Sequence, residues 1–252
     1  MAEIVIVPDA AAAGALVADE ITALVQQRAD AVLGLATGST PLTIWRSLAG
    51  RGLDFSQVRG FALDEYIGLP AGDPRSYRAT IDAEVVDVLG LDPALVHVPG
   101  DGLDGAALAG AGEQYEALIA AAGGIDLQVL GIGRTGHIGF NEPGSSFASR
   151  TRVKTLMRVS REDNARFFDG DVDAVPQHCV TQGLGTILDA RRLVLLAFGE
   201  AKAESIAAAV EGPVTASLPA SAIQLHPDVT VFVDDAAASQ MRFADYYREV
   251  WA

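Results

Sequence analysis

The chain contains a single cysteine, Cys179, and this scarcity excludes two kinds of stabilising site. One cysteine can neither close a disulfide within the chain nor supply a cysteine-rich metal site. No second cysteine stands at the spacing of a redox motif, so we expect Cys179 to pack in the interior. Half of the 252 residues are hydrophobic, so the chain can bury a large core without a covalent or metal clamp.

Basic residues are also few, because 18 lysines and arginines stand against 33 acidic residues and give a formal net charge of −15. This balance argues against a nucleic-acid or anionic-membrane partner. Only Lys154 and Lys202 are lysines. An anionic small molecule would therefore need a local island of positive charge.

Long apolar runs and internal repeats are absent from the sequence. The first ten residues, MAEIVIVPDA, hold a four-residue apolar run, which is too short for a secretory signal or a membrane span. No low-complexity segment or flexible linker divides the chain. We expect one domain over residues 1–252, located in the cytoplasm.

Apolar runs that predict buried strands alternate with helical patterns along the chain. This alternation predicts an α/β domain with a mostly parallel open sheet. The predicted strands are 4–7, 31–36, 58–63, 96–98, 127–132, 193–198 and 229–233, and the predicted helices are 9–28, from 42 onward, 76–89, 107–121, 181–188, one ending at 210, and a last one through about Trp251.

Two short stretches follow predicted strands and carry groups suited to a ligand. The small-residue turn Thr37–Pro41, which includes Gly38, Ser39 and Thr40, enters a helix and exposes backbone donors where phosphate binds. A hydroxyl-rich helix cap without a ligand is at least as common. Asp64, Glu65 and Tyr66 follow the strand 58–63, at the edge where open α/β sheets bind ligands.

The stretch LGIGRTGHIGFNEP, residues 130–143, is the densest in chemistry. Its glycines satisfy the dinucleotide pattern GxGxxG, but that site needs a helix directly after the glycines and an acidic residue about 20 positions later. Gly139 and Pro143 interrupt a helix here, and the downstream segment is TRVKTL, so we reject a nucleotide site. His137 and Glu142, five residues apart in a loop, can instead move protons in sequence. A backbone-capped histidine and a solvent-facing glutamate are the plainer alternative.

A basic cluster follows directly, with six of the 18 basic residues in 150–166. We expect it to form the anion-binding island, although a solvated basic face is the usual explanation of such a run. The polar, turn-rich segment 155–180 is expected to form a lid over the site. Lys202 lies in the first turn of a helix after a strand, where a point charge adds to exposed backbone donors to hold phosphate.

Taken together, the segments TGSTP, DEYIGLP, GHIGFNEPGSSFASRTRVKTL, NARFF and AVEGPV resemble the glucosamine-6-phosphate deaminase family, in order, from about residue 30 to residue 235. The resemblance implies a three-layer, Rossmann-like α/β sandwich. It also implies conversion of an amino-sugar phosphate to fructose 6-phosphate and ammonia, without a metal or nucleotide cofactor. We expect a homo-oligomer.

The resemblance carries roles to individual residues of this chain. Asp64 matches the base that moves a proton between C2 and C1, His137 the ring-opening acid/base, and Glu142 its partner. The phosphate cradle matches Gly38, Ser39, Thr40, Arg166 and Lys202.

At one position the chain departs from the family pattern, because Thr135 stands where Asp or Asn is usual. A hydroxyl can orient His137 but cannot stabilise its cation as a carboxylate does. Allosteric members of the family also bind an N-acetylated sugar phosphate between subunits, and that site matches Ser145, Arg152, Lys154 and Thr155.

Alternatives remain open at this stage. A deaminase of the galactosamine epimer, or a related isomerase or lactonase, would use the same fold, although a lactonase does not need a carboxylate placed for carbon-acid chemistry. A sugar-phosphate-sensing effector domain is the non-enzymatic alternative. The charge of −15 opposes DNA binding, and the chain starts directly with the first predicted strand.

Overall fold

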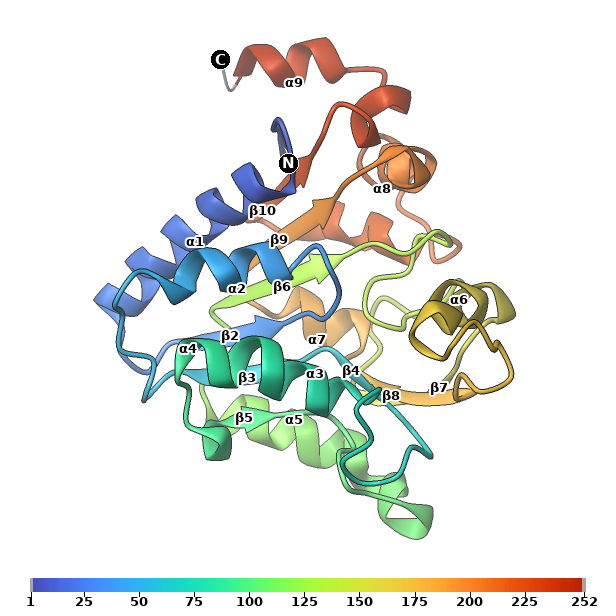
Figure 1. The fold of residues 1–252 in the computed structure, drawn as a ribbon. Coiled ribbons are helices and arrows are strands. Elements are labelled where there is room, and N and C mark those ends of the chain that lie inside the picture. The colour runs from blue at the N-terminus through green and yellow to red at the C-terminus, as the bar shows by residue number, and fades with distance from the viewer. Residues whose placement is uncertain (1, 251–252) are drawn as a thin grey trace.

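The computed structural model describes residues 2–250, and a seven-stranded sheet runs through its centre (Figure 1). The predicted end of the last helix, Trp251, lies outside the described residues. Each strand pairs in parallel with its neighbours, in the spatial order β1 (Glu3–Ile6), β10 (Val229–Val233), β9 (Arg192–Ala197), β6 (Leu127–Gly131), β2 (Val32–Leu35), β3 (Arg59–Ala62) and β5 (Val96–His97).

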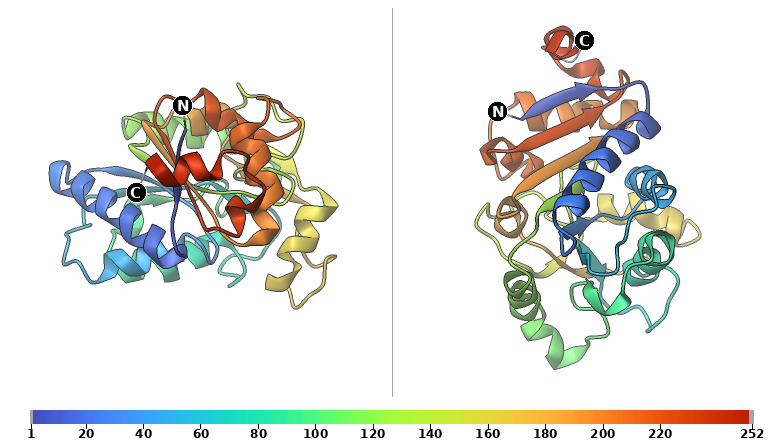
Figure 2. Two further views of the ribbon diagram at one scale, coloured as in Figure 1. Left: turned by 90° about the horizontal axis from the view of Figure 1, so that it is seen from above. Right: turned by 90° about the vertical axis from the view of Figure 1, so that its left-hand side faces the viewer.

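Helices cover both faces of this sheet, so the predicted three-layer α/β architecture is confirmed (Figure 2). One face carries α1, α2 and the α3–α4 segment, and the other carries α5 and α7. The α-helices are α1 (Ala10–Gln27), α2 (Leu42–Ala49), α3 (Tyr77–Ile81), α4 (Asp87–Leu89), α5 (Ala111–Ala121), α6 (Arg158–Asn164), α7 (Leu184–Leu188), α8 (Ala203–Glu211) and α9 (Ala244–Val250). In residues 2–250 no helix is both long and apolar enough to cross a membrane.

Local sequence explains why these elements form where they do. Asp9 caps α1 by accepting a hydrogen bond from the Ala12 N–H at 2.8 Å, and the helix buries a stripe at Ala13, Val17 and Ile21. Strands β2 and β10 are buried at every position, as expected for parallel strands covered on both faces. Continuous apolar runs therefore mark the central strands in the sequence.

A second, smaller sheet was not predicted. It contains β4 (Asp64–Tyr66), β8 (His178–Thr181) and β7 (Arg152–Thr155), all antiparallel, with β8 in the middle. The prediction that Asp64–Tyr66 simply ends the strand 58–63 was wrong. The chain leaves the main sheet at Leu63, whose N–H still donates to Leu35 while its carbonyl already accepts from Gln182.

The small sheet has a hydrophobic core of its own, formed by Tyr66, Phe140, Leu156, Ala165, Phe168, Val175 and Cys179. The segment 155–180, predicted to be polar and turn-rich, supplies five of these seven residues and contains α6. It is therefore more ordered than its composition indicated. Cys179 is buried there, as expected.

Three helices differ from the sequence prediction. The helix predicted over 107–121 opens with a 3₁₀ segment at Gly105–Gly110, and α5 begins only at Ala111. The predicted helix 76–89 is capped by Ser76, but residues 82–86 form a π-helical turn between α3 and α4. The helix predicted from Thr181 begins only at Leu184, because Thr181 pairs with Asp64 in the small sheet.

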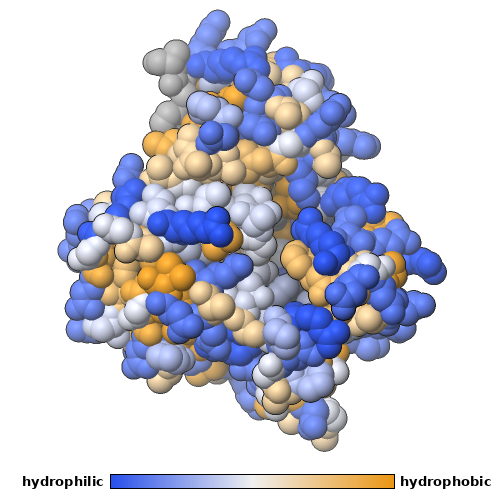
Figure 3. All heavy atoms as spheres, in the orientation of Figure 1, coloured by the Kyte–Doolittle hydropathy of each residue, from blue (hydrophilic) through white to orange (hydrophobic). Residues whose placement is uncertain are grey.

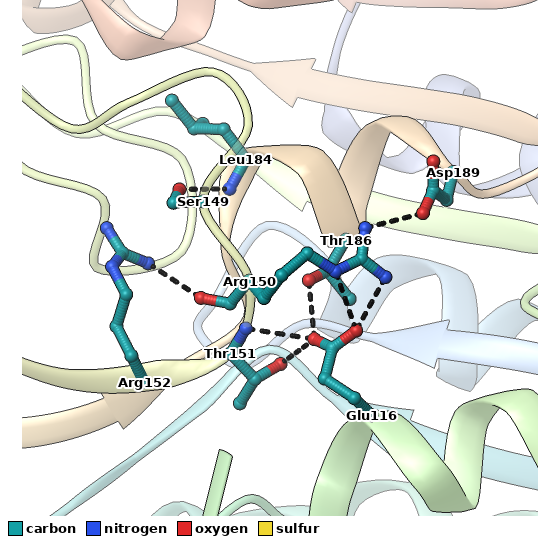
Figure 4. A network of polar contacts seen from close by, with 8 residues as sticks. All are labelled: Glu116, Ser149, Arg150, Thr151, Arg152, Leu184, Thr186 and Asp189. Carbon is teal, nitrogen blue, oxygen red and sulfur yellow. Dashed lines mark hydrogen bonds and ion pairs between the residues drawn. The ribbon is translucent and has the colours of Figure 1, made fainter. Parts of the chain in front are cut away.

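One polar network joins α5 to α7 and to the segment that leads into β7 (Figure 4). The Glu116 carboxylate accepts hydrogen bonds from the Thr151 N–H at 2.9 Å, the Thr186 hydroxyl at 2.6 Å and the Arg150 guanidinium at 2.6 and 2.9 Å. Burial raises the pKa of Glu116, but these hydrogen bonds and the charge of Arg150 lower it by more, so the net shift is downward. The ionised carboxylate thus stabilises the fold.

Replacing Glu116 by Gln should lower the free energy of unfolding by about 1–3 kcal/mol at pH 7, because the amide group cannot accept all of these bonds. A carboxyl group with a depressed pKa stabilises the fold above its usual pKa, and this contribution is lost as the pH falls through the folded-state value. The deficit of Glu116→Gln in urea denaturation should therefore shrink at acidic pH.

Asp189→Asn is the matched control, because Asp189 contacts the same Arg150 but its side chain is 68% exposed. Its loss should be under about 1 kcal/mol. Equal losses in the two variants would show that Glu116 is no more than a surface ion pair.

Candidate functional site

A cavity of about 350 Å³ opens where the carboxyl ends of β2, β3, β6 and β9 meet. The strand order reverses between β2 and β6, and such a switch point is where open α/β sheets bind ligands. The loop of residues 36–41 after β2 and the loop of 131–133 at the end of β6 form its two sides. The molecular surface is hollowed between the part of the molecule that contains the seven-stranded sheet and the part that contains α6 (Figure 3).

Asp64 lines the cavity and is the first residue of β4, directly after the chain leaves the main sheet at Leu63. Its carboxylate is buried and receives no hydrogen bond from the described part of the chain. Burial, with a smaller effect from the charge of Glu65, raises the pKa of Asp64 to about 8. A carboxylate in this state is a stronger base than one in water and is suited to proton abstraction.

Gly139 keeps the space beside Asp64 open. Its φ of +54° lies in the left-handed region that favours glycine, and a Cβ atom there would stand 3.0 Å from the Thr181 hydroxyl and 3.5 Å from Asp64 Oδ2. A side chain at this position would fill the approach to the carboxylate.

The neighbouring Glu65 has a different environment, although the sequence presented the two acids as a pair. Its side chain accepts hydrogen bonds from the backbone N–H groups of Tyr66, Tyr77 and Arg78 at 2.7, 3.0 and 2.7 Å. Burial raises the pKa of Glu65, and the three hydrogen bonds oppose that rise. Glu65 therefore holds the first turn of α3 and does not line the cavity.

His137 lies against the backbone of the glycine loop and lines the cavity. A Cβ atom at Gly133 would stand 2.1 Å from the imidazole ring, so only glycine permits this packing. The ring atom Nδ1 lies 2.9 Å from the Thr135 hydroxyl and 3.6 Å from Glu142 Oε2. Nε2 forms no hydrogen bond within residues 2–250, which leaves it available to a ligand.

Glu142 is buried, so the alternative of a solvent-facing glutamate was wrong. Its Oε1 accepts the Met157 N–H at 3.1 Å, and its Oε2 accepts the Thr135 hydroxyl at 3.3 Å. Burial raises the pKa of Glu142, but hydrogen bonds with His137 and Ser160 and the charge of the imidazole lower it by more. The Glu142 carboxylate is therefore expected to stay ionised beside the imidazole.

The predicted phosphate residues all line the same cavity and come from three separate parts of the chain: Gly38, Ser39, Thr40, Arg166 and Lys202. Gly38 adopts a φ of +105°, which turns the loop into α2. Lys202 Nζ donates to the Ile132 carbonyl at 2.7 Å. Burial lowers the pKa of Lys202, and nearby Asp163 opposes this shift. Together these groups are suited to an anion.

Several cavity residues were not predicted, among them Tyr77, Ser160, Asp163 and Asn164. Asn164 donates to the Tyr66 hydroxyl at 2.8 Å, and this bond ties α6 to β4. Asp163 pairs with Arg134 of the glycine loop at 2.8 Å. No local pattern marks these side chains, although Asp163 and Asn164 lie three and two residues before the predicted Arg166.

The residues matched to a second sugar-phosphate site are not among those that line this cavity. The Ser145 hydroxyl donates to the Glu142 carbonyl at 2.7 Å and accepts from Arg152 at 3.3 Å. Lys154 is two positions after Arg152 in β7, on the same face of the strand, and the exposed Thr155 lies 3.2 Å from His178 Nδ1. Within residues 2–250, no cluster of three or more His, Cys, Asp or Glu side chains could hold a metal ion.

Comparison with known proteins gives a consistent result. Residues 9–232 match the family model described as glucosamine-6-phosphate isomerases/6-phosphogluconolactonase. The glucosamine-6-phosphate deaminase of Bifidobacterium longum (strain DJO10A) is 58% identical to this chain, over 98% of the chain and 96% of the relative. The protein of the same name from Streptomyces avermitilis is 56% identical, over 99% and 97%.

Solved structures resemble the fold as well. One described as a monomeric glucosamine-6-phosphate deaminase is 39% identical and aligns with a TM-score of 0.90, over 94% of this chain and 99% of that one. The 6-phosphogluconolactonase of Trypanosoma brucei aligns with a TM-score of 0.72 at 19% identity, over 95% and 98%. The second likeness concerns the fold alone.

The raised pKa of Asp64 predicts a stability effect of defined sign. Between about pH 4 and pH 8 the unfolded chain releases the Asp64 proton while the folded protein retains it, so stability falls as the pH rises through this window. Asp64→Asn removes this effect. The variant should be more stable than the wild type by about 1–3 kcal/mol at pH 8, with no such gain near pH 4, in urea denaturation.

Glu65→Gln is the matched control. The side-chain NH₂ group of the glutamine would stand opposite the Arg78 N–H, so the hydrogen bond that Glu65 accepts from Arg78 would be lost. It should destabilise the protein at both pH values. A destabilised Asp64→Asn at pH 8 would mean that the Asp64 carboxylate has stabilising partners.

Proposed function

The chain belongs to the family of glucosamine-6-phosphate isomerases and 6-phosphogluconolactonases, and we propose that it acts as a glucosamine-6-phosphate deaminase. The enzyme converts glucosamine 6-phosphate and water to fructose 6-phosphate and ammonia. The observation that carries the proposal is the cavity itself. It is lined by a buried carboxylate with a raised pKa, by His137, whose Nδ1 side faces Glu142, and by a cationic anchor made by Arg166 and Lys202.

The phosphate anchor fixes the substrate first. Lys202, Arg166 and the turn Gly38–Thr40 hold the phosphate, and binding energy from this remote group aligns the reacting carbons. His137, through its free Nε2, transfers the proton that opens the pyranose ring, and Glu142 stabilises the resulting imidazolium. Asp64 then takes the C2 proton and returns it to C1.

Ammonia leaves because of the oxidation level reached after this proton shift. The nitrogen then sits on a carbon at the carbonyl oxidation level, so water adds there and ammonia departs with the proton that water supplies. No electron sink takes part in these steps. The residues therefore need only to anchor the phosphate and move protons.

Thr135 modifies the acid/base pair in this proposal. Its hydroxyl donates to Glu142 at 3.3 Å and lies 2.9 Å from His137 Nδ1, so it links the two groups without adding a negative charge. Glu142 is then the carboxylate nearest to the imidazolium. The alternative substrate is the galactosamine epimer, since the C4 hydroxyl has no assigned partner. A lactonase is disfavoured because it does not need a base such as Asp64.

Four further parts of the proposal concern the assembly of the protein, its location, a second site and a lid. We propose a homo-oligomer located in the cytoplasm, with Ser145, Arg152, Lys154 and Thr155 as a second sugar-phosphate site. The contact between Ser145 and Arg152 supports this site. The segment 155–180, which carries α6 along the cavity, acts as its lid. A single-chain mass in sedimentation would contradict the oligomer.

The activity is tested by incubating the protein with glucosamine 6-phosphate or its galacto epimer and measuring ammonia. We expect release from the gluco sugar and a drop in turnover by about 10² to 10⁴ in Asp64→Asn. Solvent deuterium should no longer enter the sugar in this variant. Glu116→Gln, a carboxylate change outside the cavity, controls for general damage, and retained exchange in folded Asp64→Asn would move the base elsewhere.

Replacing Lys202 by Met should weaken substrate binding by the contribution of one charge-assisted hydrogen bond, about 1.5–3 kcal/mol or roughly ten- to a hundredfold. The loss should be far smaller for unphosphorylated glucosamine. Arg242→Met removes an exposed charge near α9 and serves as the control. Equal losses for both sugars would exclude a phosphate contact by Lys202.

A further inference from the structure

Ser160 is a buried serine of α6 whose position no sequence pattern indicated. Its side chain is 1% exposed, it lines the cavity, and its Oγ lies 3.4 Å from His137 Nδ1. Ser160 is 18 residues downstream of Glu142, so only the fold brings them together. A buried hydroxyl group normally forms hydrogen bonds, so the partners of the Ser160 hydroxyl beside the acid/base pair need to be identified.

Three oxygen atoms surround His137 Nδ1, and their distances decide which can bond to it. Thr135 Oγ1 lies at 2.9 Å, Ser160 Oγ at 3.4 Å and Glu142 Oε2 at 3.6 Å. A separation of 3.6 Å is too long for a direct hydrogen bond. The two hydroxyls are therefore closer to the imidazole than the carboxylate is, and they can connect the two groups.

The protons of these hydroxyls can be assigned from the same contacts. Thr135 donates its one proton to Glu142 and so has lone pairs free to accept from Nδ1–H. Ser160 is placed to share this arrangement, since hydrogen bonding by its hydroxyl lowers the pKa of Glu142. Nδ1 has only one hydrogen, which it donates mainly to Thr135 at 2.9 Å, so Ser160, at 3.4 Å, donates toward the carboxylate and takes at most a minor share of that hydrogen.

Helix α6 brings Ser160 to the pair. Just before this helix, the Met157 N–H donates to Glu142 Oε1 at 3.1 Å. After it, Arg166 lines the cavity as well. The segment from 157 to 166 thus contacts both the acid/base pair and the cavity, and the position of Ser160 depends on how this segment packs.

We propose that Ser160 is a positioning residue of the acid/base pair, which, together with Thr135, bridges His137 to Glu142 through its hydroxyl. The proposal rests on the proposed function of the cavity. It assigns Ser160 no contact with the reacting carbons. Its hydroxyl keeps Glu142 ionised and Nδ1 protonated, so that Nε2 is the nitrogen that exchanges a proton with the sugar.

The charged and titratable groups that face Glu142 are His137, from the same loop, and Cys179, from β8. Burial raises the pKa of the Cys179 thiol well above its usual range, so it stays neutral. A change in the titration of Glu142 on removal of the Ser160 hydroxyl therefore reports on the lost hydrogen bond.

The first test compares Ser160→Ala, Ser160→Thr and Ser221→Ala in steady-state kinetics. Ser221 is a buried serine outside the cavity and controls for the loss of an interior hydroxyl. In Ser160→Ala, kcat should fall roughly three- to tenfold, the change expected for one net hydrogen bond, while KM and the inhibition constant of inorganic phosphate stay within about twofold. Ser160→Thr should restore kcat.

The pH profile of kcat adds a readout that a purely structural role would not move. Loss of the hydroxyl removes a bond that stabilises the Glu142 carboxylate, so the acidic limb should shift to higher pH in Ser160→Ala and stay in place in Ser221→Ala. A higher KM with unchanged kcat would make Ser160 a substrate contact and overturn the proposal. A profile equal to that of the wild type would also overturn it.

A substrate-free measurement separates this proposal from the proposed activity. In protein with ¹³C-labelled glutamate, the carboxyl titration of Glu142, assigned with Glu142→Gln, should move to higher pH in Ser160→Ala. An unchanged titration overturns the positioning role even if the wild type releases ammonia. A shifted titration supports it even if the wild type releases none, and the proposed function then fails alone.

Discussion

The burial of the Asp64 carboxylate at the junction of two sheets is the constraint on which the site depends. The chain passes from the parallel sheet to the antiparallel one at Leu63. The next residue, Asp64, therefore lies at the junction of the two sheets and is shielded from water. No donor in the described chain offsets this burial, and the pKa rises to about 8. The large core of the parallel sheet supplies the stability that lets a carboxylate be held in this unfavourable state.

The contrast between Asp64 and Glu65 shows how the alternation of a strand separates two identical functional groups. Adjacent residues of β4 point to opposite faces. One carboxylate faces the cavity without partners, and the other meets three backbone N–H groups and fixes the start of α3. The two side chains carry the same functional group, so the number of hydrogen-bond donors around each carboxylate decides which one is reactive.

The acid/base pair and the phosphate anchor come from different elements, and the segment around α6 contributes to both. The loop after β6 carries His137 and Glu142, while Lys202 follows β9 and its ammonium group is held by the Ile132 carbonyl. The segment around α6 adds Ser160 beside His137 and Arg166 to the cavity lining. Binding of the phosphate and placement of the acid/base pair thus share one short stretch of chain.

The sequence by itself determined the parallel sheet, because fully buried strands need continuous apolar runs, and it located His137, Lys202 and the turn Gly38–Thr40 at strand ends. It did not reveal the small sheet, since β4 has three residues and β7 alternates between half-buried and exposed positions, which leaves no apolar run to detect. Composition and strand pattern did not separate Asp64 from Glu65, which only the family resemblance distinguished, and no pattern indicated Ser160. Those properties depend on which donors and hydroxyls the fold places within about 3 to 3.5 Å, and such contacts between residues distant in the chain exist only after the tertiary structure has formed.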